Sequence, residues 1–123
     1  MSRVIIYDDD KDILTMTATV LELDGHEIAV RKDCNSLDED LAYFRPEVIL
    51  MDNWLPGMKG VDAIRSIKNN ENFTHIPIVF FSANSNSEQM AREAGAEWLL
   101  NKPFDMDDLL DIVKKAVKNT AMC

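Results

Sequence analysis

Short runs of apolar residues alternate along the chain with longer stretches in which apolar residues recur every three or four positions. Short apolar runs between polar turns are typical of buried strands, and the longer period is typical of amphipathic helices. The runs predict five strands, at about Arg3–Tyr7, Glu27–Val30, Val48–Met51, Ile76–Phe81 and Trp98–Leu100. The periodic stretches predict five helices, at about 10–23, 36–45, 61–68, 85–94 and 105–118.

This regular alternation of strands and helices predicts a parallel sheet with helices on both faces. The run Ile76–Phe81 is apolar at nearly every position, as expected for a strand that is buried on both sides. A chain of 123 residues fits one domain of ordinary size. We therefore expect residues 1–123 to form a single doubly wound α/β domain.

Composition narrows the classes of function. The formal net charge of −9 disfavours direct binding to nucleic acid or to anionic lipid. The sequence has no apolar run of about 18 residues and no signal peptide, so we expect no membrane span and a cytoplasmic location. Cys34 and Cys123 lack metal-ligand spacing, which argues against a zinc site or a disulfide framework.

Acidic residues follow two of the predicted strands directly. Asp8, Asp9 and Asp10 come after the first strand, and Asp52 comes after the third. In open α/β sheets ligands bind beyond the carboxyl ends of the strands, where these side chains would meet. Two unit charges about 4 Å apart repel by roughly 4 kcal/mol at an effective dielectric constant near 20. Such a cluster needs a cation, and ligands that are all oxygen favour Mg²⁺.

Two further residues complete a set of groups suited to phosphoryl transfer. Ser82 and Lys102 follow the fourth and fifth predicted strands, at the same edge of the sheet. A carboxylate can attack phosphorus to form an acyl phosphate, while a lysine and a hydroxyl bind the phosphoryl oxygens. Taken alone, each of these residues could equally well be a helix cap, a turn residue or part of a solvated loop. Their placement at successive strand ends favours the chemical explanation.

The chain resembles the receiver domain of two-component response regulators. The resemblance rests on motifs in order along the whole chain: Ile5-Ile6-Tyr7-Asp8-Asp9-Asp10, Val48-Ile49-Leu50-Met51-Asp52, Leu55-Pro56-Gly57-Met58-Lys59-Gly60, Phe81-Ser82-Ala83, Gly95-Ala96 and Lys102-Pro103-Phe104. It implies a (βα)5 flavodoxin-like fold whose five parallel strands have the order 2-1-3-4-5.

The resemblance also implies roles for the acidic residues. Asp52 would accept the phosphoryl group. Asp9 would bind Mg²⁺ directly and Asp8 largely through water, and the backbone carbonyl of Trp54 would complete the protein ligands. Trp54 and Asn84 fall at positions that tune the lifetime of the phosphoryl group in this family.

The residues around the last strand have implied roles as well. Lys102 would pair with the phosphoryl group, and Ser82 would move to hydrogen-bond it after transfer. The Lys102–Pro103 peptide would be cis. The family often has an aromatic residue three positions before the lysine. This chain has Leu99 there, next to Trp98, which puts the usual coupling of the hydroxyl to an aromatic side chain in doubt.

The expected partners follow from the same resemblance. A histidine kinase or a histidine phosphotransfer protein would supply the phosphoryl group. A downstream target protein would bind the face formed by segments 85–94, 98–100 and 105–118, including Glu88, Arg92, Trp98 and Asp108. We expect a stand-alone receiver without an output domain. It would be monomeric, with a phosphorylation-dependent dimer as the alternative, and would catalyse only its own phosphorylation and dephosphorylation.

Two other functions compete with the switch. Aspartyl-phosphate hydrolases of the haloacid dehalogenase type require a second Asp two residues after the nucleophile, where this chain has Trp54. An interaction module that works without phosphorylation usually lacks some of the acids or the lysine, all of which are present here. Neither the P-loop pattern nor G-x-G-x-x-G occurs in the sequence, so nucleotide binding has little support.

Overall fold

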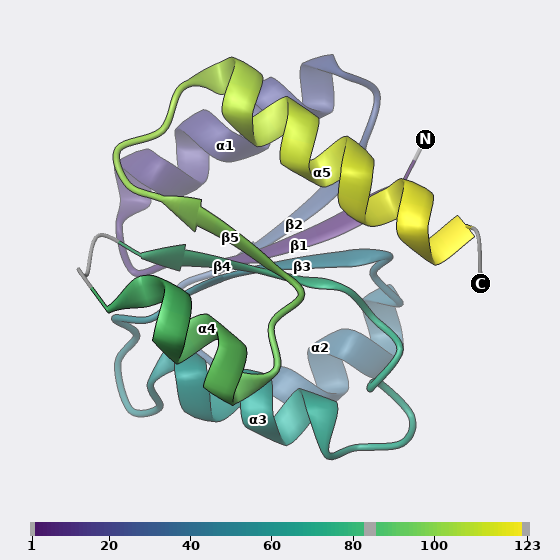
Figure 1. Cartoon of the computed structure of the whole chain (residues 1–123). Coiled ribbons are helices and arrows are strands. Elements are labelled where there is room, and N and C mark those ends of the chain that lie inside the picture. Colours follow the sequence, from purple (N-terminus) through teal and green to yellow (C-terminus); the bar gives the residue numbers. More distant parts are fainter. Residues whose placement is uncertain (1, 83–85, 122–123) are drawn as a thin grey trace.

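Five parallel strands form one sheet with helices on both faces in the computed structural model of the chain (Figure 1). The structure describes residues 2–82 and 86–121. The strands are β1 (Arg3–Tyr7), β2 (Glu27–Arg31), β3 (Val48–Asp52), β4 (Ile78–Ser82) and β5 (Trp98–Asn101). The helices are α1 (Lys11–Leu23), α2 (Leu37–Phe44), α3 (Gly60–Lys68), α4 (Ser87–Ala94) and α5 (Met106–Ala121). The strand order β2-β1-β3-β4-β5 confirms the expected fold class.

The helices divide into two layers. Figure 1 shows α1 and α5 on one face of the sheet and α2, α3 and α4 on the other. Successive side chains of a strand point to opposite faces of the sheet, so each strand contributes side chains to the core on both faces. The core beneath α1 and α5 includes Val4, Ile6, Val48, Leu50, Val79, Phe81 and Leu100. The core on the other face includes Ile5, Tyr7, Ile49, Met51, Ile78 and Phe80. Because every residue of β3 and β4 is buried, these strands carry little polar sequence before their last position.

Some strand boundaries differ from the predicted ones. β4 begins at Ile78, two residues later than predicted, because Pro77 has no N–H to donate to a neighbouring strand. The Pro77 carbonyl still accepts a hydrogen bond from Ile49 N at 3.0 Å. β3 continues through Asp52, which pairs with Phe81 in β4. Asp52 is therefore fixed by the sheet rather than carried by a loop.

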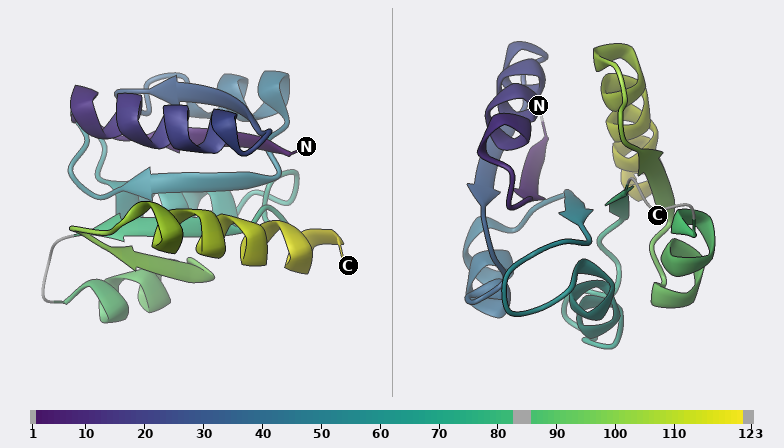
Figure 2. Two further views of the ribbon diagram at one scale, coloured as in Figure 1. Left: turned by 90° about the horizontal axis from the view of Figure 1, so that it is seen from above. Right: turned by 90° about the vertical axis from the view of Figure 1, so that its left-hand side faces the viewer.

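All five strands end at the same edge of the molecule. Figure 2 shows the strand arrows pointing to one end and both chain termini lying at the other. The loops that follow β1, β3 and β5 therefore meet at the edge where the sequence predicts the acidic cluster. Among the residues that the structure describes, no helix combines the length and apolar character needed to cross a bilayer.

Candidate functional site

The register of the two central strands brings Asp8 and Asp52 side by side. Tyr7 pairs with Met51, and the two carboxylates belong to the next residue of each chain segment. Both residues are buried, with 1% and 4% of their surface exposed. Two carboxylates that are nearly removed from water repel each other strongly, so they require a positive partner.

Lys102 provides that positive charge. Its Nζ donates hydrogen bonds to Asp8 Oδ2 at 2.9 Å and to Asp52 Oδ1 at 3.0 Å. The backbone N–H of Lys102 donates to the Ser82 carbonyl at 2.9 Å, which ties the end of β5 to β4. The Lys102–Pro103 peptide is cis, as the resemblance implied. The lysine therefore reaches the two carboxylates from an anchored backbone.

Backbone N–H groups satisfy the other carboxylate oxygens. Asp10 N donates to Asp8 Oδ1 at 2.9 Å, and Trp54 N donates to Asp52 Oδ2 at 3.2 Å. Each of the four oxygens thus accepts one hydrogen bond from the described part of the chain. An sp² oxygen has two lone-pair directions, so each keeps capacity for a further ligand.

The environment changes the pKa values of both partners. Burial raises the pKa of Asp52, and the Asp8 charge raises it further, although the hydrogen bonds from Lys102 and Trp54 N oppose this rise. Burial by itself would lower the pKa of Lys102, but hydrogen bonds and attraction to Asp8 and Asp52 together raise it. Ionised Asp52 is therefore less stable in the folded protein than in the unfolded chain, while Lys102 stays protonated.

Asp52→Asn is expected to stabilise the protein at neutral pH by about 1 kcal/mol, since the removal of a buried charge outweighs the loss of one of its two hydrogen-bond acceptor oxygens. A carboxyl group whose pKa is raised in the folded protein does not lower the free energy of unfolding at pH values below its pKa in the unfolded chain, which is near 3.8. As the pH rises from that value to the pKa in the folded protein, the carboxyl group lowers the free energy of unfolding progressively. Urea denaturation of both proteins without divalent ions, from pH 3 to pH 8, measures this difference. A variant that is less stable than the parent at pH 7 would contradict the prediction.

The buried pair of carboxylates, Asp8 and Asp52, borders a cavity of about 390 Å³. It is lined by Asp8, Asp9, Asp10, Asp52, Trp54 and Lys102. Four acidic residues and a single lysine line it, and carboxylate oxygens are the ligands that Mg²⁺ prefers. In the described part of the chain no three His, Cys, Asp or Glu side chains are already grouped at metal-binding separation. The donor chemistry nevertheless fits a hard divalent cation whose remaining ligands are water.

The three consecutive acidic residues have different surroundings. Asp8 lies in the buried pair. Asp10 is the N-cap of α1, where its Oδ1 accepts hydrogen bonds from Asp12 N at 2.9 Å and Ile13 N at 3.2 Å. Asp9 is exposed and lines the cavity. The helix-cap explanation therefore accounts for one residue of the run, and Asp8 and Asp9 remain candidates for binding a cation.

The structure also places the other predicted residues. Ser82 ends β4 and is fully buried beside the anchored backbone of Lys102. Leu99 is half-buried and packs against the core on the face covered by α2, α3 and α4, whereas Trp98 packs against the core beneath α1 and α5. Asn84 lies outside the described residues.

The predicted target-binding face is partly charged. Glu88 and Arg92 are exposed on α4 and form an ion pair at 2.9 Å. Asp108 is exposed near the start of α5. These side chains are available to a partner, unlike the buried pair.

Asn53 and Gly60 support the site and were not predicted from the sequence. Asn53 is buried, and its carbonyl accepts hydrogen bonds from Leu55 N at 3.2 Å and Gly60 N at 2.9 Å. Its side-chain Oδ1 accepts one from Val61 N at 3.3 Å. Asn53 thereby closes the loop between Asp52 and α3. The sequence signals for this close approach were a glycine next to the start of a predicted helix and its place in the motif Leu55–Gly60 that carries the family resemblance.

Known proteins match nearly the whole chain in sequence, at identities near 30%. The family model described as "Response regulator receiver domain" matches residues 4–114. The phosphate regulon transcriptional regulatory protein PhoB of Pseudomonas aeruginosa is 29% identical over 119 residues, which are 95% of this chain and 52% of PhoB. The regulatory protein AtoC of Escherichia coli is 30% identical over 124 residues, which are 99% of this chain and 26% of AtoC. This chain thus spans about half or less of the length of these relatives.

Solved structures agree with the fold. The receiver domain of NtrX from Brucella abortus is 28% identical, with a TM-score of 0.83 over 94% of this chain and 98% of that domain. A putative response regulator from Chloroflexus aurantiacus has a TM-score of 0.90 at 24% identity, over 95% of this chain and 98% of its own. At that identity the second likeness supports the fold alone.

Proposed function

This chain belongs to the response regulator receiver domain family, whose model matches residues 4–114, and on this premise we propose that Asp52 is its phosphoryl acceptor. Receivers are the signalling domains of two-component systems. The donor would be a histidine kinase or a histidine phosphotransfer protein. Phosphorylation would then shift the domain between two conformational states.

One observation carries this proposal: Asp52 is a buried carboxylate that is oriented by Lys102 and Trp54 N and faces an open cavity. An Asp52 oxygen would attack phosphorus while the bond from phosphorus to the donor's imidazole nitrogen breaks. The products are an acyl phosphate on Asp52 and a free imidazole that takes up a proton. Lys102, held next to the attacking oxygen, would pair with the added negative charge.

The family also binds Mg²⁺ at this position. We propose that Asp8, Asp9, Asp52 and the Trp54 carbonyl would hold the ion in this chain. It would supply positive charge that offsets the charge on the nucleophile and on the phosphoryl oxygens. The excess of carboxylates over lysine in the cavity supports this assignment.

Contacts of Ser82 and Lys102 with the phosphoryl group would change the conformation of the α4-β5-α5 face. Ser82 would hydrogen-bond the phosphoryl group and draw the end of β4 toward it. Leu99, which packs on the side of α4, would repack in the place of the usual aromatic residue. A target protein would then distinguish the two states at Glu88 and Arg92. The free-standing, monomeric receiver expected from the sequence stays a prediction.

Labelling by a small phosphodonor tests the function. We expect acetyl phosphate with Mg²⁺ to add one phosphoryl group, visible by mass spectrometry of the intact protein. Asp52→Asn should abolish this addition, and removal of Mg²⁺ by EDTA should prevent it. Asp10→Asn is the matched control, because asparagine also caps helices well and should leave labelling intact. Unchanged labelling of Asp52→Asn would rule out Asp52 as the acceptor.

A further inference from the structure

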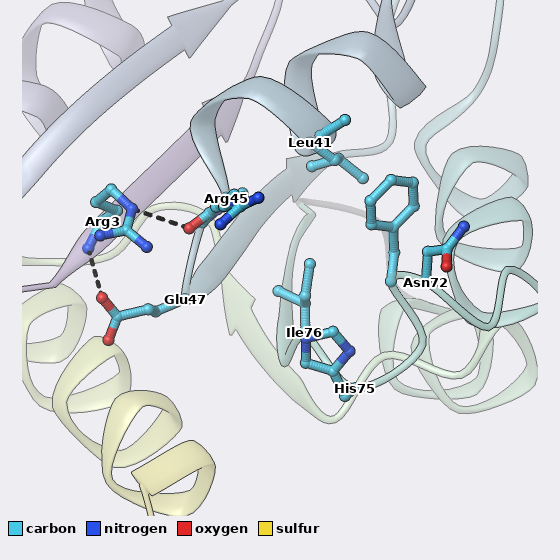
Figure 3. Close-up of a pocket in the computed structure, with 10 residues that line it drawn as sticks. Arg3, Leu41, Arg45, Glu47, Asn72, His75 and Ile76 are labelled. Atoms are coloured by element: carbon cyan, nitrogen blue, oxygen red, sulfur yellow. Dashed lines mark hydrogen bonds between the residues drawn. The ribbon is translucent and has the colours of Figure 1, made fainter.

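A second and larger cavity lies at the other end of the sheet. Its volume is about 510 Å³, and it opens between the end of α2 and the connection from α3 to β4. Figure 3 shows Arg3, Arg45 and Glu47 on one side and Asn72, His75 and Ile76 on the other. Arg3 begins β1, and Asp8 follows the end of that strand. Five residues at about 3.3 Å each separate the two sites by roughly 16 Å.

The floor of this cavity is apolar. Leu41 and Ile76 are 1% and 4% exposed, and Pro46 is buried. Phe73 is half-buried and packs against the same core. An apolar molecule could therefore bury part of its surface here. The cavity volume lies within the range of about 300–1,000 Å³ that is typical of small-molecule pockets.

The rim carries an excess of basic groups. Two arginines, Arg3 and Arg45, line it together with the imidazole of His75, against a single acid, Glu47. Arg3 is held in place, since its Nε donates to the Phe44 and Arg45 carbonyls at 3.0 Å and its backbone N–H donates to Glu47 Oε1 at 3.3 Å. This concentration runs against the composition of the chain, which has 13 Lys and Arg residues against 22 Asp and Glu residues. The rim is therefore suited to an anion.

Arg45 stands out within this rim. Among the residues that the structure describes, it is the only non-glycine residue with positive φ, at 52°. It ends α2 in the left-handed conformation, which is strained for an ordinary residue and nearly free of strain for a glycine. Across the described ranges, neither Arg45 nor His75 has a side-chain hydrogen bond or ion pair. A guanidinium group is thus placed on the rim, despite the backbone strain, without a protein partner.

We propose that this cavity binds a small aromatic carboxylate. Its ring would lie on Leu41, Phe73 and Ile76, and its carboxylate would take the bidentate hydrogen bonds that the Arg45 guanidinium offers. Arg3 would add positive charge from its fixed position. The site needs no phosphorylation, so this proposal does not depend on the role of Asp52.

Titration with 1-naphthoate, followed by ¹H–¹⁵N NMR of the full chain, tests the proposal. We expect saturable shifts at the amides of Leu41, Phe73 and Ile76, with a Kd on the order of 1 mM or tighter. The neutral analogue 1-naphthamide should bind roughly tenfold more weakly because it lacks the charge. Absence of saturable shifts at these amides, or equal affinity for the two compounds, would overturn the proposal.

Two variants identify the group that binds the carboxylate. Arg45→Asn removes the guanidinium but keeps a residue that tolerates positive φ, so the fold should be retained. It should weaken 1-naphthoate roughly tenfold and leave 1-naphthamide unchanged. Arg65→Gln, on the exposed side of α3 and outside the cavity, should change neither affinity. Should Arg45→Asn be poorly folded, Arg45→Gly serves the same purpose. Unchanged binding of 1-naphthoate by the folded variant would contradict the assignment.

Discussion

Gly60→Ala is expected to lower the free energy of unfolding by about 3 kcal/mol, at the upper end for overpacking of a closely packed site. A Cβ at this position would lie 2.0 Å from the Asp52 carbonyl oxygen and 2.8 Å from Asn53 Cα. Both atoms are backbone, and the sheet fixes one of them through the pairing of Asp52 with Phe81. The loop after β3 must therefore shift, and the Asp52 carboxylate would shift with it. Urea denaturation and labelling by acetyl phosphate measure the two effects.

Gly25→Ala is the matched control for this variant. Gly25 has a φ of +94°, and no atom would lie within 4 Å of an added Cβ. The substitution should cost about 1 kcal/mol through backbone conformation alone and should leave phosphorylation intact. If Gly60→Ala lowers the free energy of unfolding no more than Gly25→Ala does, that result would contradict the close approach of the start of α3 to β3.

Lys102→Met should lower the free energy of unfolding by about 2 kcal/mol at pH 7 in the absence of divalent ions. This is less than the loss expected for a fully buried ion pair, because 21% of the Lys102 side chain is exposed. The loss arises from two buried carboxylates left without a cation. It should shrink at low pH, where Asp52 becomes protonated. Labelling of Asp52 should slow by roughly 100-fold or more, as for loss of one charge-stabilising group.

A second substitution separates charge from packing. Adding Asp52→Asn to Lys102→Met should restore most of the lost stability, because one buried negative charge then remains instead of two. Lys115→Met is the surface control, since both side chains of its ion pair with Asp111 are exposed. Loss of that pair should cost only about 0.5 kcal/mol. A double variant as unstable as Lys102→Met would show that the lysine acts through packing of its aliphatic chain.

The sequence pattern predicted where the strands lie better than where they end. The apolar run at Ile76–Phe81 identified β4, but Pro77 delayed the start of its pairing. The pattern for β3 stopped at Met51 because aspartate is uncommon in strands, although pairing continues through Asp52. Local residue preference defines the middle of an element, whereas hydrogen bonding to neighbouring strands decides its last residue.

The acidic run shows the same limit within the site. Asp8, Asp9 and Asp10 are chemically identical, and apart from the roles that the family resemblance implied for Asp8 and Asp9, the sequence indicated only that acids gather after β1. Their surroundings separate them: Asp8 is buried beside Lys102, Asp10 caps α1, and Asp9 faces the cavity. A side chain's direction changes with each residue at the end of a strand, so burial follows from the register of the sheet.

The sequence by itself determined the order of strands and helices, the parallel sheet, and the edge at which the acids, Ser82 and Lys102 would gather. Hydrophobic periodicity depends on residues a few positions apart, so it can be read along the chain. The tertiary structure decided which atoms meet. It joined Lys102 to Asp8 across 94 positions and to Asp52 across 50. It also placed Gly60 against the Asp52 carbonyl and Arg45 at the rim of a second cavity. Such contacts depend on how the crossover helices set the strands against each other, which no short segment of the chain encodes.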